Sequence, residues 1–284
     1  SGKTMLASRM HTILPDLDDD TALVATSLHS LAGTLRDGEA LVRRPPILTP
    51  HHSATMAALV GGGHARITPG AASLAHGGVL FLDEAAQFQP SVLDALREPL
   101  ENGEVHIHRA GLHARLPARF QLLLAANPCP CGGGRQGRSC TCSAQARMRY
   151  LARLSGPLLD RIDITVRVDT PTRADLARGP SPSSARLRER VAEARSRCAR
   201  RLAGTPWTLN AQVPGRWIRA SSGIDPRMVA DLDRAVESGV FSMRGADRVL
   251  RLMWTTADLN GAARPGEVER GLAIWLRKGD NPND

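Results

Sequence analysis

The sequence predicts an α/β domain built on a parallel sheet, followed by an all-helical domain. Two apolar runs of strand length, residues 79–82 and 122–126, each end in polar residues and are separated by a helical pattern. A continuous apolar run of this length suits a central strand that is buried on both faces. From residue 185 onward, apolar residues recur at helical spacing instead. The 42% of hydrophobic residues and 23% of charged residues are ordinary for a globular protein of 284 residues.

The first domain begins with two helical patterns, at residues 1–14 and 21–34, separated by Pro15 and a run of acids. Residues 36–52 contain three prolines and predict a loop. After the strand at 79–82, a helix is predicted from Pro90 to its stop signal at Gly103.

Residues 104–120 then predict a β-hairpin with its turn at Ala110-Gly111, and residues 121–126 predict the next buried strand. We place the α/β core at residues 1–170, a Gly-, Pro- and Ser-rich linker at 171–184, and the helical domain at 185–284. Helices of this second domain are predicted near residues 187–202, 226–238, 244–260 and 265–277.

The chain opens with Ser1-Gly2-Lys3-Thr4, the last four residues of a phosphate-binding loop pattern. Such a loop cradles phosphates with backbone N–H groups, while its Lys contacts the β- and γ-phosphates and its hydroxyl binds Mg²⁺. We therefore predict that Gly2, Lys3 and Thr4 bind nucleotide and that Thr4 also binds the metal ion. A match of four residues alone would also suit a surface turn.

Two acids follow the first buried strand, and an amide follows the second. Asp83 is expected to hold Mg²⁺, and Glu84 to polarise a water for attack on a γ-phosphate. Asn127 is positioned to hydrogen-bond that water or the phosphate. Each feature alone also suits a surface turn, but their order along the chain favours a nucleoside triphosphatase.

The whole constellation resembles the AAA+ ATPases and, more narrowly, the magnesium-chelatase-like group called YifB or ComM. The resemblance covers essentially the whole chain, and its most specific parts are the Cys-Pro-Cys-Gly segment at 129–132 and Gly-Pro-Leu-Leu-Asp-Arg-Ile-Asp at 156–163. Further matching segments are Pro50-His51-His52-Ser53, the glycine triplet at 61–63, residues 73–84, Asn210-Ala211-Gln212 and residues 242–245. The resemblance implies a P-loop AAA+ core with a helical lid, Mg²⁺-dependent ATP hydrolysis and a homo-oligomeric ring, commonly a hexamer.

The resemblance also implies roles for two arginines. Arg161 matches the arginine finger that reaches the γ-phosphate of a neighbouring subunit, although a salt bridge with Asp160 or Asp163 is the simpler alternative. Arg244 matches the sensor-2 arginine of the lid, which contacts the bound nucleotide.

Four of the five cysteines, Cys129, Cys131, Cys140 and Cys142, lie within 14 residues. Thiolates gathered in this way suit tetrahedral Zn²⁺, although C-x-C spacing is less usual than C-x-x-C. Free thiols or a redox site remain the alternatives, since disulfides are disfavoured in the cytoplasm, where we expect this protein.

Positive charge points to DNA as a partner. The formal net charge is +9, and residues 127–159 contain five arginines and no acid. The ComM resemblance implies the same partner through branch migration, and the hairpin histidines and arginines could face a ring pore. The simpler alternative is a solvated basic surface. We expect no membrane partner, because the apolar runs are far shorter than about 20 residues.

Two other functions stay open: a true magnesium-chelatase ATPase subunit, and a non-catalytic, zinc-stabilised DNA-binding or scaffold protein. Because the chain begins inside the phosphate-binding motif, we expect a fragment whose first sheet strand lies upstream and which binds ATP poorly alone. His51 and His52 have no carboxylate nearby in sequence and are expected to be structural.

Overall fold

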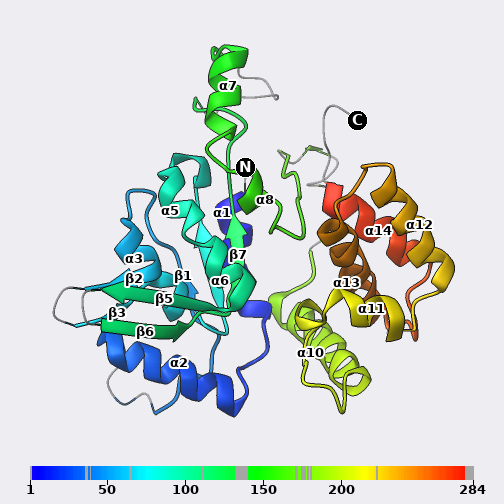
Figure 1. Ribbon diagram of the computed structural model, residues 1–284, viewed down its shortest axis with the longest axis horizontal. Helices are drawn as coiled ribbons and strands as arrows, with labels where there is room; N and C mark the ends of the chain where they lie inside the picture. Colours follow the sequence, from blue (N-terminus) through cyan, green and yellow to red (C-terminus); the bar gives the residue numbers. More distant parts are fainter. Residues whose placement is uncertain are drawn as a thin grey trace. The chain divides into compact units, whose positions relative to one another are not determined.

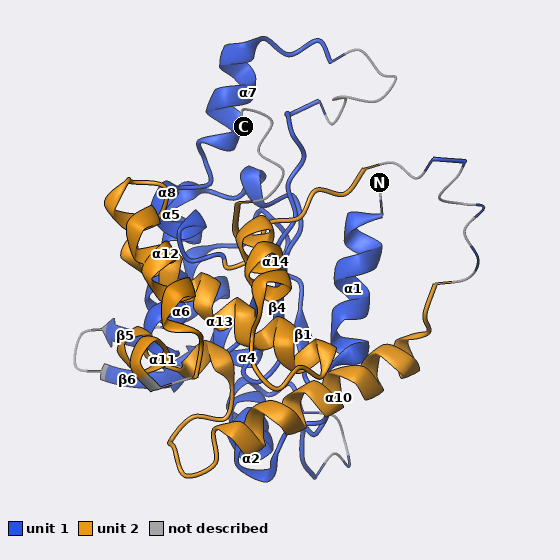
Figure 2. Cartoon of the chain, turned by 90° about the vertical axis from the view of Figure 1, so that its right-hand side faces the viewer, with its two compact units in different colours: residues 1–162, 170–179 blue, residues 163–169, 180–284 orange. Residues whose placement is uncertain are grey.

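A computed structural model describes residues 2–35, 38, 40–63, 66–109, 112–131, 140–169, 172–173, 177, 179, 181–221 and 223–278. The chain divides into two compact units (Figure 2). The first comprises Ser1–Ile162 and Thr170–Gly179, and the second comprises Asp163–Asp169 and Pro180–Asp284. The parallel sheet of the first unit and the helices of the second confirm the predicted fold class.

The sheet of the first unit has three parallel strands in the order β1 (Ile47–Leu48), β4 (Val79–Leu82) and β7 (Gln121–Leu124). The central strand β4 is buried on both faces because its successive side chains point to opposite sides. Leu80 and Leu82 enter the main core of the unit, whereas Val79 and Phe81 pack toward Ala7 and Leu14 at the first helix. One short strand therefore supports two cores.

The sheet differs from the sequence prediction at β1, which lies within the stretch expected to be a loop. Prolines flank this strand, but it is only two residues long and pairs with β4 alone, so no proline has to donate to the ladder. Pro46 instead accepts a 2.8 Å hydrogen bond from the Val79 N–H. A side chain at Gly78 would collide with the Pro46 carbonyl, which explains a glycine directly before β4.

The helices predicted for the first unit differ from the observed ones in two places, and four further α-helices of this unit, whose bounds are given below, were not predicted. The second helix, α2 (Asp19–Ala32), begins two residues early because Asp18 caps it by accepting from the Thr21 N–H at 2.8 Å. The single helix predicted before Gly103 is two helices, α5 (Pro90–Asp94) and α6 (Arg97–Asn102). The break lies just before Pro99, which can occupy the first turn of a helix but not its interior.

The first unit contains further strands and helices besides this sheet (Figure 1). Strands β5 (Glu104–Arg109) and β6 (Leu112–Pro117) form the predicted hairpin, whose turn at residues 110–111 lies outside the described residues. The other elements are α1 (Lys3–Ile13), α3 (Met56–Val60), β2 (Gly61–Gly62), β3 (Thr68–Pro69), α4 (Ala71–Leu74), η1 (Ala85–Gln87), α7 (Ala144–Leu151) and α8 (Gly156–Leu159).

The second unit is a helical bundle arranged around α13 (Met243–Asn260), which is buried along most of its length. Leu250, Met253 and Ala257 form the centre of its core. The four helices predicted in this region are present with ends shifted by at most three residues; they are α10 (Ser184–Arg201), α12 (Pro226–Glu237), α13 and α14 (Glu267–Lys278). Two further elements, η2 (Asn210–Gln212) and α11 (Gly215–Ser221), were not predicted. Within the described residues, no helix is both long and apolar enough to cross a membrane.

Candidate functional site

Three elements of the first unit bring the predicted site residues to one edge of the sheet. Strand β4 ends directly before Asp83 and Glu84, strand β7 ends three residues before Asn127, and α1 begins at Lys3. Because parallel strands end at the same edge, residues that follow them lie close together. We call Lys3, Thr4, Asp83, Glu84 and Asn127 the strand-edge cluster.

Hydrogen bonds join the two halves of this cluster. The Lys3 ammonium donates to Asn127 Oδ1 at 2.6 Å and to the Ala126 carbonyl at 2.9 Å. The Lys3 ammonium therefore joins the start of the chain to two residues that lie 123 and 124 positions further along it. Gly2 caps the amino-terminal end of α1 and its carbonyl accepts from Leu6 N–H at 2.9 Å.

A second pair of residues, Thr4 and Asp83, brings side-chain oxygen atoms together. The Thr4 hydroxyl donates to Asp83 Oδ2 at 2.7 Å, and Asp83 Oδ1 accepts from the Glu84 N–H at 2.8 Å. A hydroxyl and a carboxylate are hard oxygen donors of the kind that Mg²⁺ prefers. This donor set fits a magnesium ion bound with a phosphate.

Glu84 has an unusual backbone conformation. With φ of 51° and ψ of 40°, it is the only non-glycine residue at positive φ in the described part of the chain. This left-handed conformation costs about 1–2 kcal/mol, and the bonds on either side of it offset that cost. Besides the Asp83 contact, the Ala85 N–H donates to the Ala125 carbonyl at 2.8 Å. The Glu84 side chain remains 44% exposed and able to meet a ligand.

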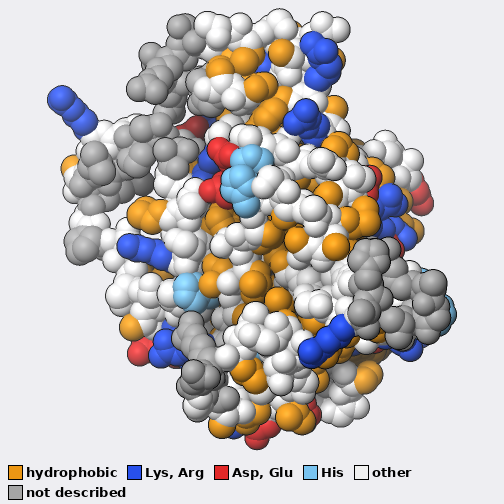
Figure 3. All heavy atoms as spheres, turned by 90° about the vertical axis from the view of Figure 1, so that its left-hand side faces the viewer, with side chains coloured by type: hydrophobic (Ala, Val, Ile, Leu, Met, Phe, Trp, Pro, Cys, Tyr) orange, Lys and Arg blue, Asp and Glu red, His pale blue; other side chains and the backbone are white. Residues whose placement is uncertain are grey.

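His51 and His52 were both expected to be structural because no carboxylate lies nearby in sequence, and the structure gives His52 a carboxylate neighbour that is distant in sequence. His52 Nδ1 lies 3.6 Å from Glu84 Oε2, and the His51 ring packs on the His52 ring at a centroid distance of 4.0 Å. Both histidines follow β1, so they lie at the same sheet edge as the acids. Recognising β1 in the sequence would have placed both histidines at this sheet edge, but not in contact with Glu84. Figure 3 shows a face of the molecule on which histidine and acidic side chains lie against one another.

Tyr150 is a further residue near Glu84 that the sequence did not single out. It is buried on α7, and burial raises the pKa of its phenol, with the negative charge of Glu84 adding to the shift. Tyr150 is the only tyrosine of the chain and follows the cysteine segment, which was the available signal.

Within the described residues, Arg161 forms no hydrogen bond or ion pair with the strand-edge cluster. Its guanidinium forms an ion pair with Glu101 of α6 and donates to the Pro157 carbonyl at 2.6 Å. Asp163, one of the two partners considered from sequence, lies in the second unit and pairs with Arg248 at 3.1 Å. Arg244 is exposed near the start of α13 in the second unit.

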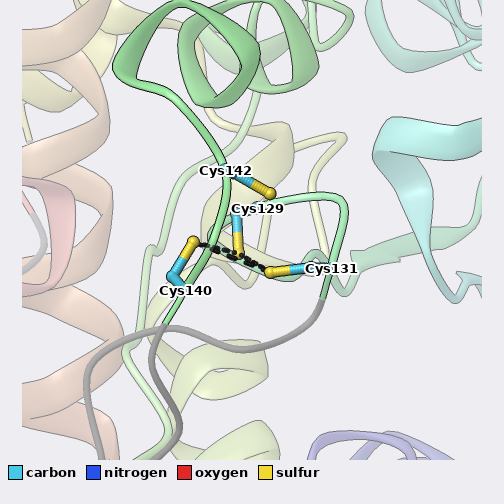
Figure 4. Close-up of side chains that lie close together, drawn as sticks. All are labelled: Cys129, Cys131, Cys140 and Cys142. Atoms are coloured by element: carbon cyan, nitrogen blue, oxygen red, sulfur yellow. Dashed lines mark hydrogen bonds between the residues drawn. The ribbon is translucent and has the colours of Figure 1, made fainter.

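The four clustered cysteines converge in space (Figure 4). Their Sγ atoms lie within 4.8 Å of one another, and three of the separations are 3.3, 3.5 and 3.6 Å. Tetrahedral Zn²⁺ with bonds of about 2.3 Å would hold sulfur atoms about 3.8 Å apart. The four residues therefore fit a zinc ion with small adjustments, and none of them is in a disulfide.

Burial raises the pKa of the Cys129 thiol to about 12, and the neighbouring thiols of Cys131 and Cys140 add to the shift. A bound cation favours the thiolate form, so metal binding at this site releases protons and strengthens as the pH rises. Gly132 to Ser139, including Arg135 and Arg138 of the basic segment, lie outside the described residues.

Comparison with known proteins gives a family match over nearly the whole chain. Residues 1–176 match the family model "Magnesium chelatase, subunit ChlI", and residues 181–277 match the model of its C-terminal part. The chain is 40% identical to YifB of Escherichia coli over 262 residues, which cover 92% of this chain and 50% of the relative. It is 41% identical to competence protein ComM of Haemophilus influenzae over 281 residues, which cover 98% of this chain and 53% of the relative.

A more distant similarity links the chain to DNA replication licensing factor mcm6 of Dictyostelium discoideum, with 35% identity over 102 residues. That match covers 36% of this chain and 11% of the relative. The chain spans about half the length of the YifB and ComM relatives.

Proposed function

Because this chain belongs to the magnesium chelatase ChlI family, within the group of YifB and ComM proteins, we propose that it is the ATP-hydrolysing part of a Mg²⁺-dependent motor. The observation that carries the proposal is the pair of hydrogen bonds that join Lys3 to Asn127 and Thr4 to Asp83. These contacts gather a cation, a hydroxyl, a carboxylate and an amide at one sheet edge, as triphosphate chemistry requires.

Each member of the strand-edge cluster has a distinct role in this proposal. The Lys3 ammonium neutralises the β- and γ-phosphates, and the N–H groups at the start of α1, beginning after Gly2, face the phosphates. Thr4 and Asp83 hold Mg²⁺, which lowers the charge of the phosphates and orients them. Glu84 accepts a proton from the attacking water, while the Asn127 amide orients that water or the γ-phosphate.

Two arginines complete the site in an assembled ring. Arg161 supplies positive charge to the γ-phosphate in a neighbouring subunit, and Arg244 of the helical unit contacts the nucleotide. The proposed assembly is a homo-oligomeric ring, commonly a hexamer in this family. The bounds of the core at 1–170, the linker at 171–184 and the lid at 185–284 remain predictions.

DNA is the proposed partner of the motor, in branch migration of recombination intermediates. The acid-free arginine segment at 127–159 supports it, because such a surface attracts a phosphate backbone. Relatives named as a competence protein and as a DNA replication licensing factor support it as well. The exposed face of the β5–β6 hairpin, which bears His106, His108 and Arg115, is a candidate contact.

The cysteine cluster is proposed to hold a structural Zn²⁺ ion. The converging thiols suit a reducing compartment and support a cytoplasmic location. We expect about one equivalent of zinc per chain by elemental analysis, and its loss in Cys140→Ser. Cys198→Ser is the matched control, because Cys198 is buried in the second unit away from the cluster residues in sequence. Equal zinc content in both variants would exclude this site.

ATP hydrolysis by the full-length protein, measured with and without branched DNA, tests the proposed function. We expect DNA-stimulated hydrolysis in the wild type. Glu84→Gln should retain ATP binding and lose about 100-fold or more in turnover, because the general base is absent. Glu189→Gln, which changes an exposed carboxylate of α10, should leave turnover unchanged.

The same assay separates the two alternative functions. A magnesium-chelatase subunit, which the description of the family model favours, would hydrolyse ATP without a response to DNA. A non-catalytic scaffold would show no hydrolysis that depends on Glu84.

A further inference from the structure

Arg161 is held in a position that does not use all of its hydrogen-bonding groups. Its side chain is only 9% exposed, it pairs with Glu101, and it donates to the Pro157 carbonyl. Yet its buried Nε–H has no hydrogen-bond partner in the described part of the chain. A buried donor left unsatisfied is unfavourable, so this position is not the best one that an arginine could have.

The side chain also has space beside it. A cavity of about 460 Å³ is bordered by Arg161 and by residues of α3, α5, α6 and β5, among them Asp94, Glu98, Glu101 and His106. A guanidinium that lines a cavity of this size can change direction without repacking the hydrophobic core. The geometry therefore allows Arg161 a second orientation.

Among the carboxylates that line the cavity, Glu101 is the one paired with Arg161. Glu98 lies 3.5 Å from His106 Nδ1, and Asp94 accepts from the Ser155 hydroxyl at 2.7 Å. Glu101 is itself 42% exposed, so water screens its attraction for the arginine. A triphosphate carries several negative charges and can displace a single, partly exposed carboxylate.

From this arrangement, and resting on the proposed role of Arg161 as a finger that acts in trans, we propose that Glu101 stores Arg161 within its own subunit. Arg161 exchanges the Glu101 carboxylate for the γ-phosphate of the neighbouring subunit when the ring assembles around nucleotide. Glu101 is thus a positioning residue that restrains turnover until a neighbouring γ-phosphate competes for the guanidinium. No covalent bond changes in this exchange.

The test is ATP turnover by the full-length, assembled protein carrying Glu101→Gln. The amide retains an oxygen that can accept from Arg161 but lacks the charge, so we expect kcat to rise roughly fivefold with KM for ATP unchanged. Glu101→Asp keeps the charge and should restore the wild-type rate. Glu98→Gln, the matched control on the same helix, should leave kcat unchanged. Glu101→Ala provides a second variant if Glu101→Gln does not fold.

Epistasis with Arg161 completes the test. Arg161→Ala should abolish most of the turnover, and Glu101→Gln/Arg161→Ala should be no more active than Arg161→Ala alone. A lower or unchanged kcat in both Glu101→Gln and Glu101→Ala would overturn the storage role. Failure of the proposed function has a different signature, namely equal turnover, or none, in the wild type and in Arg161→Ala.

Discussion

Two polar networks of this protein use the same chemistry in opposite settings. In the second unit, Arg201 donates to Asp258 at 2.6 Å and to Asn210 at 3.0 Å, and the Asn210 amide donates to Asp258 at 3.0 Å. We call Arg201, Asn210 and Asp258 the lid network. Like the strand-edge cluster, it joins a cation, an amide and a carboxylate from distant parts of the chain.

The two networks differ in exposure and in how completely their groups are paired. Asp258 is 6% exposed and its carboxylate is neutralised inside the unit, whereas Glu84 is 44% exposed and faces one imidazole at 3.6 Å. Arg201 also lies over the Trp254 ring at 3.8 Å, so packing and charge act together there. Pairing alone therefore does not identify a functional site. The proposed site differs from the lid network in its exposure and in its position at the ends of several elements.

The largest expected effect concerns the lid network, the more buried of the two networks. Asp258→Ala leaves the Arg201 charge buried without its carboxylate, and we expect the free energy of unfolding of the second unit to fall by about 3–5 kcal/mol. All four tryptophans belong to this unit, so denaturation followed by tryptophan fluorescence reports on it directly. Glu237→Ala, at an exposed position on α12, should change the stability by less than about 0.5 kcal/mol. Equal stabilities of the two variants would refute the distinction.

A second prediction concerns the strand-edge cluster. Thr4→Ala removes a proposed Mg²⁺ ligand, and we expect the Mg²⁺ concentration for half-maximal ATP turnover to rise about tenfold or more. Stability should change by less than about 0.5 kcal/mol, because the Thr4–Asp83 contact is exposed. Thr12→Ala on the same helix is the control, since the Thr12 hydroxyl only donates to the Arg9 carbonyl at 2.7 Å. A large loss of stability in Thr4→Ala would mean that the strand-edge cluster, like the lid network, mainly stabilises the fold.

The smallest expected effect lies at the start of α14. The Glu269 carboxylate accepts from the Asn260 amide at 3.1 Å and from the Gly266 N–H at 2.9 Å, and these bonds lower its pKa below the ordinary 4.5. Glu269→Gln should cost about 1 kcal/mol at pH 7. Because the native pKa is lowered, this contribution is full above pH 4.5 and is lost as the pH falls through the native value.

Unfolding free energies of the wild type and of Glu269→Gln, measured across this acidic range, check the prediction. The two curves should converge as the pH falls. Parallel curves would mean that the charge of Glu269 contributes nothing to stability.

Much of the fold could be predicted because its signals are local. Strand β4 is a run of four apolar residues between glycines and acids, and α13 has an apolar stripe with a glycine just after its end. Strand β1 was missed because two residues between prolines carry no periodicity. Helix α7 was missed because its capping residue, Ser143, precedes a segment without a clear apolar stripe.

The candidate site likewise contains residues that could be predicted from sequence and contacts that could not. Lys3, Asp83 and Asn127 could be named from sequence because Lys3 begins a helix, Asp83 directly follows a strand, and Asn127 lies three residues after the neighbouring strand. The contact of His52 with Glu84 and that of Glu101 with Arg161 could not, because 32 and 60 residues separate the partners. Only tertiary packing brings such residues together.

The division of β4 between two cores makes the number of residues in this strand matter more than their identity. Exchanging one aliphatic residue for another would alter packing locally. Inserting or deleting a single residue would turn every following side chain to the opposite side, sending Asp83 and Glu84 away from Thr4 and Asn127. A register shift of one position in this strand would therefore separate the residues of the proposed site while leaving every one of them in the chain.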